Sequence, residues 1–173
     1  VPHRAAEKKV GTVFPCKRPT SKGTLPRAAM LGAVDGVITS FAVVASASAL
    51  EDARDAALTV GAASVVADGL SMGVSEFLSS ASERAGGAAG ASPALLGVAC
   101  FVSFVAAGTL PLVVFLASEG VLAAACFALV ELMLLGSARA RTTGEPVLLG
   151  LGQTAGLGGL AGAVAFGIGR LAS

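Results

Sequence analysis

Five long apolar stretches, separated by short polar connections, make up most of the chain after residue 26. We place the spans at residues 28–50, 56–80, 93–117, 120–137 and 147–168. Each is close to the roughly 20 apolar residues that a helix needs to cross a bilayer, the fourth being the shortest. Ala, Gly and Ser are abundant in them, as is typical of closely packed membrane helices. The pattern predicts an all-α, polytopic membrane protein with five transmembrane helices.

The composition supports a membrane location. Of the 173 residues, 54% are hydrophobic and 13% are charged, and the mean hydropathy is +0.82, whereas soluble domains carry about 25% charged residues. Cys100 and Cys126 lie in apolar stretches and are expected to be buried, inert thiols, and no CxxC pair is present. The single histidine is His3, so a histidine-based metal site is not expected. Nothing indicates a nucleic-acid partner.

Residues 1–26 are polar, basic and rich in proline, which predicts a disordered tail or a remnant of a targeting segment. Residues 27–173 would form the transmembrane domain. With the N-terminus in the cytosol, ten of the 12 Lys and Arg residues fall on the cytosolic side, and only Arg54 and Arg170 lie opposite. The positive-inside rule therefore favours a cytosolic N-terminus and a C-terminus across the membrane.

Acidic residues inside the spans carry most of the functional information. They are Asp35, Asp68, Glu76 and Glu131. An ionisable group near the bilayer centre costs at least about 2.5–3.5 kcal/mol, so such residues usually face the bundle interior and serve a function. The predicted spans contain no Lys or Arg. Salt bridges inside the spans are therefore not expected.

The second span has a polar stripe. Asp68, Met72 and Glu76 follow one another at intervals of four residues and stay within about 80° of the helix circumference, over a length of about 12 Å. Glu83 continues the stripe at the expected cytosolic mouth. The opposite arc of the helix is apolar and holds Val66, Leu70, Val74 and Phe77.

The first span supplies a partner for this stripe. Counted from the cytosolic end, Asp35 is expected near the depth of Met72, so that Asp35, Met72 and Glu76 would converge. Carboxylates bind hard divalent cations, and a thioether among them favours a transition ion such as ferrous iron. Because metal binding to acids releases protons, such a site would also allow metal/proton exchange. The expected metal ligands are thus Asp35, Asp68, Met72 and Glu76.

Plainer interpretations exist for several of these residues. A methionine in an apolar helix is usually packing material, and Glu131, which lies towards Arg139 and Arg141, would either line the path or pair with an arginine. In the fifth span, Gly152-xxx-Gly156 and Gly158-xxx-Gly162 predict close helix contact. A membrane scaffold or assembly subunit is the alternative function, and it would not need the acidic stripe. An intramembrane enzyme has no support, because no GxSxG motif or paired nucleophile and base is present.

Two segments carry a resemblance to a known family. Residues 27–45 read RAAMLGAVDGVITSFAVVA, and residues 67–79 read ADGLSMGVSEFLS. They resemble the first-helix and second-helix patterns of the vacuolar iron transporter family, R…LG..DG….F..V and A…SM..gEyLS. Weaker matches lie at residues 110–112 and 167–170.

The resemblance implies a homodimer of five-helix protomers in a membrane of the vacuole or a similar store. Such a protein would move ferrous iron, and often manganese, out of the cytosol in exchange for protons, along a path at or near the dimer interface. It places metal-binding roles on Asp35, Met72 and Glu76. The chain lacks the Glu-rich cytosolic domain that plant-type members carry between the second and third helices, as the short nodulin-like branch does. Glu83 is the only acid in that link.

Overall fold

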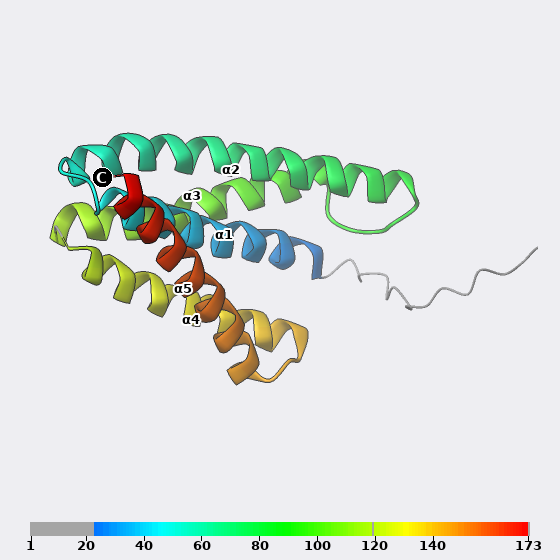
Figure 1. Cartoon of the computed structure of the whole chain (residues 1–173). Coiled ribbons are helices and arrows are strands. Elements are labelled where there is room, and N and C mark those ends of the chain that lie inside the picture. Colours follow the sequence, from blue (N-terminus) through cyan, green and yellow to red (C-terminus); the bar gives the residue numbers. More distant parts are fainter. Residues whose placement is uncertain (1–22, 119, 173) are drawn as a thin grey trace, which may run out of the picture.

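The computed structural model describes residues 23–118 and 120–172, and every regular element in them is a helix. The helices are α1 (Thr24–Ala47), α2 (Ala53–Ala85), α3 (Pro93–Ser118), α4 (Val121–Thr143) and α5 (Val147–Ala172). All five are long and apolar enough to cross a membrane, which confirms the predicted all-α membrane fold. The connections between them are short, so that consecutive helices run in opposite directions (Figure 1).

Several helix ends differ from the predicted spans. The first helix begins at Thr24, within the predicted tail; residues 1–22 of that tail lie outside the described residues. Pro26 is tolerated because the first turn of a helix has no internal partner for its N–H. At their C-terminal ends α2 continues to Ala85 and α4 to Thr143. Charged and polar residues extend both helices beyond their apolar cores.

The length of α2 has a direct consequence. Its 33 residues rise about 50 Å, whereas the hydrocarbon core of a bilayer is about 30 Å thick. At least one end of α2 therefore stands clear of the hydrocarbon. Glu83 lies near the C-terminal end, on the helix and not in the loop, and its side chain is exposed.

The central element is α1, which contacts each of the other four helices. On one side α1 packs with α2 and α3, and on the other with α4 and α5, which form a second pair set at an angle to the first (Figure 1). Among the described residues α2 contacts neither α4 nor α5. A face of α1 is consequently left between the two helix pairs.

Glycines bring the helix backbones close together where α1, α2 and α3 meet. A methyl group added at Gly73 of α2 would lie 2.9 Å from the Gly97 carbonyl oxygen of α3, and one added at Gly108 of α3 would lie 2.9 Å from the Gly36 carbonyl oxygen of α1. These distances are too short for a real side chain. The small residues therefore fix both the separation and the register of the three helices.

Two predictions about small and sulfur-containing residues need correction. Gly158 and Gly162 of α5 do make close contacts, with Leu132 and Phe41, but Gly152 and Gly156 have open space where a side chain would be. Cys100 is buried as expected, whereas Cys126 is exposed on the surface of α4. An apolar sequence does not distinguish a helix face that packs against protein from one that faces lipid, because both are apolar in a membrane protein.

Candidate functional site

The α2 helix approaches α1 and α3 with a face of small residues that also carries an acid. Its buried positions are Ala57, Gly61, Val65, Gly69, Gly73, Glu76 and Ser80. Glu76 is only 5% exposed, although it is charged and lies within a candidate membrane span. A buried carboxylate requires a partner, because desolvation strongly disfavours an unpaired charge.

The partner of Glu76 is Arg27, in the first turn of α1. The Arg27 Nη2 atom donates a hydrogen bond to Glu76 Oε1 at 2.7 Å, and the Arg27 side chain is 51% exposed. The expectation that the spans hold no internal salt bridge was therefore wrong. It was based on a first span that began at residue 28, whereas the helix starts earlier and the long arginine side chain reaches inward from its end.

This contact fixes the register of α1 against α2. Arg27 and Asp35 are eight residues apart on α1, and Glu76 and Asp68 are eight residues apart on the antiparallel α2. Both intervals correspond to about 12 Å along a helix. Asp35 therefore lies at about the depth of Asp68.

The register revises the expected geometry of the site. Asp35 lies closer in depth to Asp68 than to Met72, which falls midway between Asp68 and Glu76 on α2. Asp35, Asp68 and Met72 are all partly buried. Within the described part of the chain no three His, Cys, Asp or Glu residues gather closely enough to enclose a metal ion. We call the resulting arrangement of Glu76, Met72 and the Asp35–Asp68 pair the acidic line.

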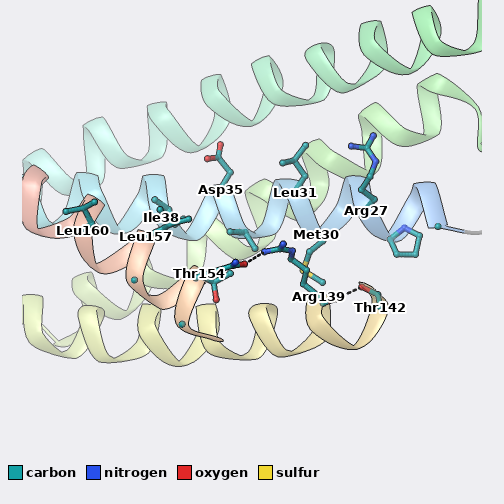
Figure 2. A pocket seen from close by; sticks show the side chains of 16 residues that line it. Arg27, Met30, Leu31, Asp35, Ile38, Arg139, Thr142, Thr154, Leu157 and Leu160 are labelled. Carbon is teal, nitrogen blue, oxygen red and sulfur yellow. Dashed lines mark hydrogen bonds between the residues drawn. The ribbon is translucent and has the colours of Figure 1, made fainter. Parts of the chain in front are cut away.

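A groove of about 1270 Å³ opens beside the acidic line, on the face of α1 between the two helix pairs. Asp35 and Arg27 belong to its lining, together with apolar residues of α1 and α5 and the C-terminal part of α4. Figure 2 shows Arg27, Leu31 and Asp35 projecting from α1 on the side of α2, while Ile38 and Leu157 lie nearer to α5. No residue of α2 lines the groove, so Asp35 is the member of the acidic line that borders it.

Polar residues of α4 and α5 in this groove were missed by the sequence reasoning. Arg139 Nη1 donates a hydrogen bond to Gln153 Oε1 at 3.2 Å, and Arg139 Nη2 pairs with Glu145 at 3.4 Å. The Thr154 hydroxyl, which is buried, reaches the Leu132 carbonyl oxygen at 3.0 Å and so joins α4 to α5. The signal was present in Gln153 and Thr154, two adjacent polar residues inside an otherwise apolar span.

The remaining acid, Glu131, lies on α4 apart from the acidic line. Its Oε2 atom is buried and has no hydrogen-bond partner in the described structure. Arg139 pairs with Glu145 and not with Glu131. Glu131 does not line the groove that Asp35 borders.

The acidic line combines carboxylates with a thioether. Asp35 and Asp68, when ionised, carry two negative charges at the same depth, which one divalent ion or two protons would neutralise. Met72, one helical turn from Asp68, adds a thioether, a ligand suited to softer transition ions. Glu76, in contrast, already has a positive partner.

Comparison with known proteins shows the family of the chain. A sequence model described as the VIT family matches residues 26–89 and 84–170, which cover most of each of the five helices and every residue of the acidic line. A curated protein from Toxoplasma gondii, named "Vacuolar iron transporter", is 36% identical over 58 residues. That match covers 34% of this chain and 19% of the relative, so the chain spans only a small part of the relative's length.

Proposed function

The chain belongs to the VIT family, and from this premise we propose that it transports a divalent transition-metal ion, ferrous iron or manganese, across an intracellular membrane. The observation that carries the proposal is that the Arg27–Glu76 contact places Asp35 and Asp68 at about the same depth, on two helices that are long and apolar enough to cross a membrane. Two like charges in a low-dielectric setting are costly unless a cation joins them. A Vacuolar iron transporter is among the relatives, although the match is partial.

The donor set supports a transition metal as the cargo. Magnesium and calcium are bound by oxygen ligands, and a thioether adds little for either ion. Met72 lies between Asp68 and Glu76 on the same helix and is partly buried. An ion that moves along α2 would pass the methionine sulfur, and ferrous iron and manganese tolerate such a mixed set better than the alkaline-earth ions do.

The same residues support exchange against protons. One divalent ion and two protons neutralise the Asp35–Asp68 pair equally well, so that occupation by one excludes the other. Metal binding to carboxylates releases protons wherever the acids were protonated beforehand. We propose metal/proton exchange from the cytosol into a vacuole or similar store, with the N-terminus in the cytosol and exposed Glu83 attracting cations at that mouth.

We further propose that the working unit is a homodimer in the lipid bilayer. The groove leaves Asp35 on an open face of α1 in the single chain. A path for ions must be shielded from lipid, because hydrocarbon cannot solvate a charge. A second copy that covers this face would provide the shield. Glu131, which lies apart from the acidic line, is a weaker candidate for lining the same path.

The proposal is tested by metal uptake into liposomes. Purified protein is reconstituted with an internal metal-sensitive dye and a proton gradient, and ferrous iron or manganese is added outside. We expect uptake by the native protein, loss of uptake in Asp35→Ala, and reduced uptake or altered ion preference in Met72→Ala. Asp55→Ala is the matched control, because Asp55 is an exposed acid in the first turn of α2, far from the acidic line.

The outcome separates a transporter from the alternative function. Uptake that persists in Asp35→Ala would remove the acidic line from the mechanism. If the folded native protein took up neither ion, the chain would instead be a membrane scaffold, and its bound partners would become the question. Equal uptake of calcium and manganese in native protein would contradict the role of Met72.

A further inference from the structure

The ion pair between Arg27 and Glu76 is not explained by metal transport alone. Glu76 lies at the end of the acidic line and is 5% exposed, and the Arg27 guanidinium contacts its carboxylate at 2.7 Å. A carboxylate that served only as a metal ligand would be expected to lie among neutral polar groups. Here the protein supplies its own cation to the carboxylate.

The two partners have unequal surroundings, which matters for exchange. The Glu76 side chain is held inside the contact between α2 and its neighbours, whereas the Arg27 side chain is 51% exposed and stands at the end of α1. Arg27 also borders the open groove, so space is available beside it. The arginine can therefore leave while the carboxylate stays in place.

Arginine cannot release Glu76 by losing its charge. Its guanidinium remains protonated at any relevant pH, so the ion pair opens only if the side chain moves away or another cation replaces it. A monovalent ion offers Glu76 the same charge as arginine without the directed N–H···O hydrogen bond. A divalent ion offers twice the charge and is the better competitor.

We propose that Arg27 is the resident cation of Glu76, and that a divalent metal ion enters this end of the acidic line by displacing the Arg27 guanidinium. The inference rests on the proposed function, because it assigns a role to Arg27 at the same site. It makes Arg27 a specificity-determining residue: monovalent ions fail to displace it, and the guanidinium returns to Glu76 once the metal has moved on to the Asp35–Asp68 pair.

The native protein allows a direct test that does not depend on transport. Purified full-length protein in nanodiscs is treated with phenylglyoxal, which modifies exposed arginines, and the modified residues are located by mass spectrometry. We expect saturating manganese to accelerate modification of Arg27 by about twofold or more, since the guanidinium gives up a charge-assisted hydrogen bond. Arg139 is the internal control, because its pairing with Glu145 lies off the acidic line. Sodium at the same ionic strength should leave both rates unchanged.

Substitution provides a second measurement. Arg27→Gln removes the competitor, so we expect manganese to bind about tenfold more tightly, the order expected when one charge-assisted hydrogen bond no longer competes. Arg54→Gln, in the first turn of α2 and outside the groove, should bind manganese as the native protein does. If Arg27→Gln does not fold, the labelling of the native protein decides the matter.

Each result has one meaning. If native protein takes up manganese but manganese leaves Arg27 modification unchanged or slows it, Arg27 is a fixed structural partner, and the inference fails while the proposed function stands. If uptake is absent but manganese still exposes Arg27, the site binds metal by displacement and the transport proposal fails. If neither occurs, both are wrong. Weaker manganese binding by folded Arg27→Gln would also overturn the inference.

Discussion

Gly36 is the residue whose substitution tests the packing that positions the acidic line. It follows Asp35 directly and is buried where α1 crosses α3. A methyl group at Gly36 would overlap the carbonyl oxygen of Phe104 and lie 3.1 Å from the Phe104 Cα atom. These are backbone atoms of a buried helix, so no flexible side chain can turn aside. In Gly36→Ala, α1 and α3 must separate.

The expected cost follows from two opposing terms. Overpacking of a well-packed contact typically costs about 1–3 kcal/mol, while replacing glycine by alanine in a helix gains up to about 1 kcal/mol. Because the overlap is with backbone atoms, the cost falls in the upper half of that range, about 2–3 kcal/mol, and the net destabilisation of Gly36→Ala is about 1–2 kcal/mol. For a chain of this size that corresponds to a fall of about 2–8 °C in the midpoint of thermal unfolding.

Gly159→Ala on α5 provides the matched control. A methyl group there meets no atom within 4 Å, so only the gain in helix propensity remains, and the midpoint should stay level or rise slightly. The chain has no Trp, so far-UV circular dichroism during heating in detergent is the suitable assay. Equal midpoints for the two variants, or a more stable Gly36→Ala, would refute the claim that α1 and α3 approach too closely for any side chain.

Other predictions concern the charges, the thiols and the contact between α4 and α5. Asp68→Asn should lose most metal uptake. If one divalent ion exchanges for two protons, no net charge crosses the membrane, and uptake by the native protein should not respond to an imposed membrane potential. An uptake rate that changes with the potential would contradict that stoichiometry. In a Cys16→Ser variant, which leaves Cys100 and Cys126 as the only thiols, a membrane-permeant maleimide should label Cys126 but not Cys100, and a charged maleimide should label neither, as read by mass spectrometry. Thr154→Val removes the hydroxyl that reaches the Leu132 carbonyl and should lower stability by about 0.6 kcal/mol in chemical unfolding, the average for such contacts in membranes.

The number of helices and the candidate acids could be predicted from the sequence, because a span of about 20 apolar residues and an acid inside it are both properties of a local segment. The ends could not. At Thr24 and Thr143 the helices continue through polar and charged residues, which hydropathy reads as loops. The missed ion pair follows from this, since Arg27 was placed outside the first span.

Depth within the bundle could not be predicted for a different reason. Helical periodicity shows that Asp68, Met72 and Glu76 share one side of α2, but it does not show which residue of α1 lies opposite. That register depends on contacts distant in the sequence, such as the close approach of Gly73 to Gly97. The same limit explains why the stretch from Gly152 to Gly156 was expected to pack and instead borders the groove.

The position of α1 gives Asp35 a role that no acid of α2 shares. The α1 helix contacts all four other helices, and its open face lies between the two helix pairs. Asp35 lies at the edge of that face, where it borders the groove at about the depth of Asp68. Asp68 and Glu76 take part in the acidic line without lining the groove. Asp35 is therefore the carboxylate of the acidic line that lies directly beside the groove, while Glu76 is separated from the groove by Arg27.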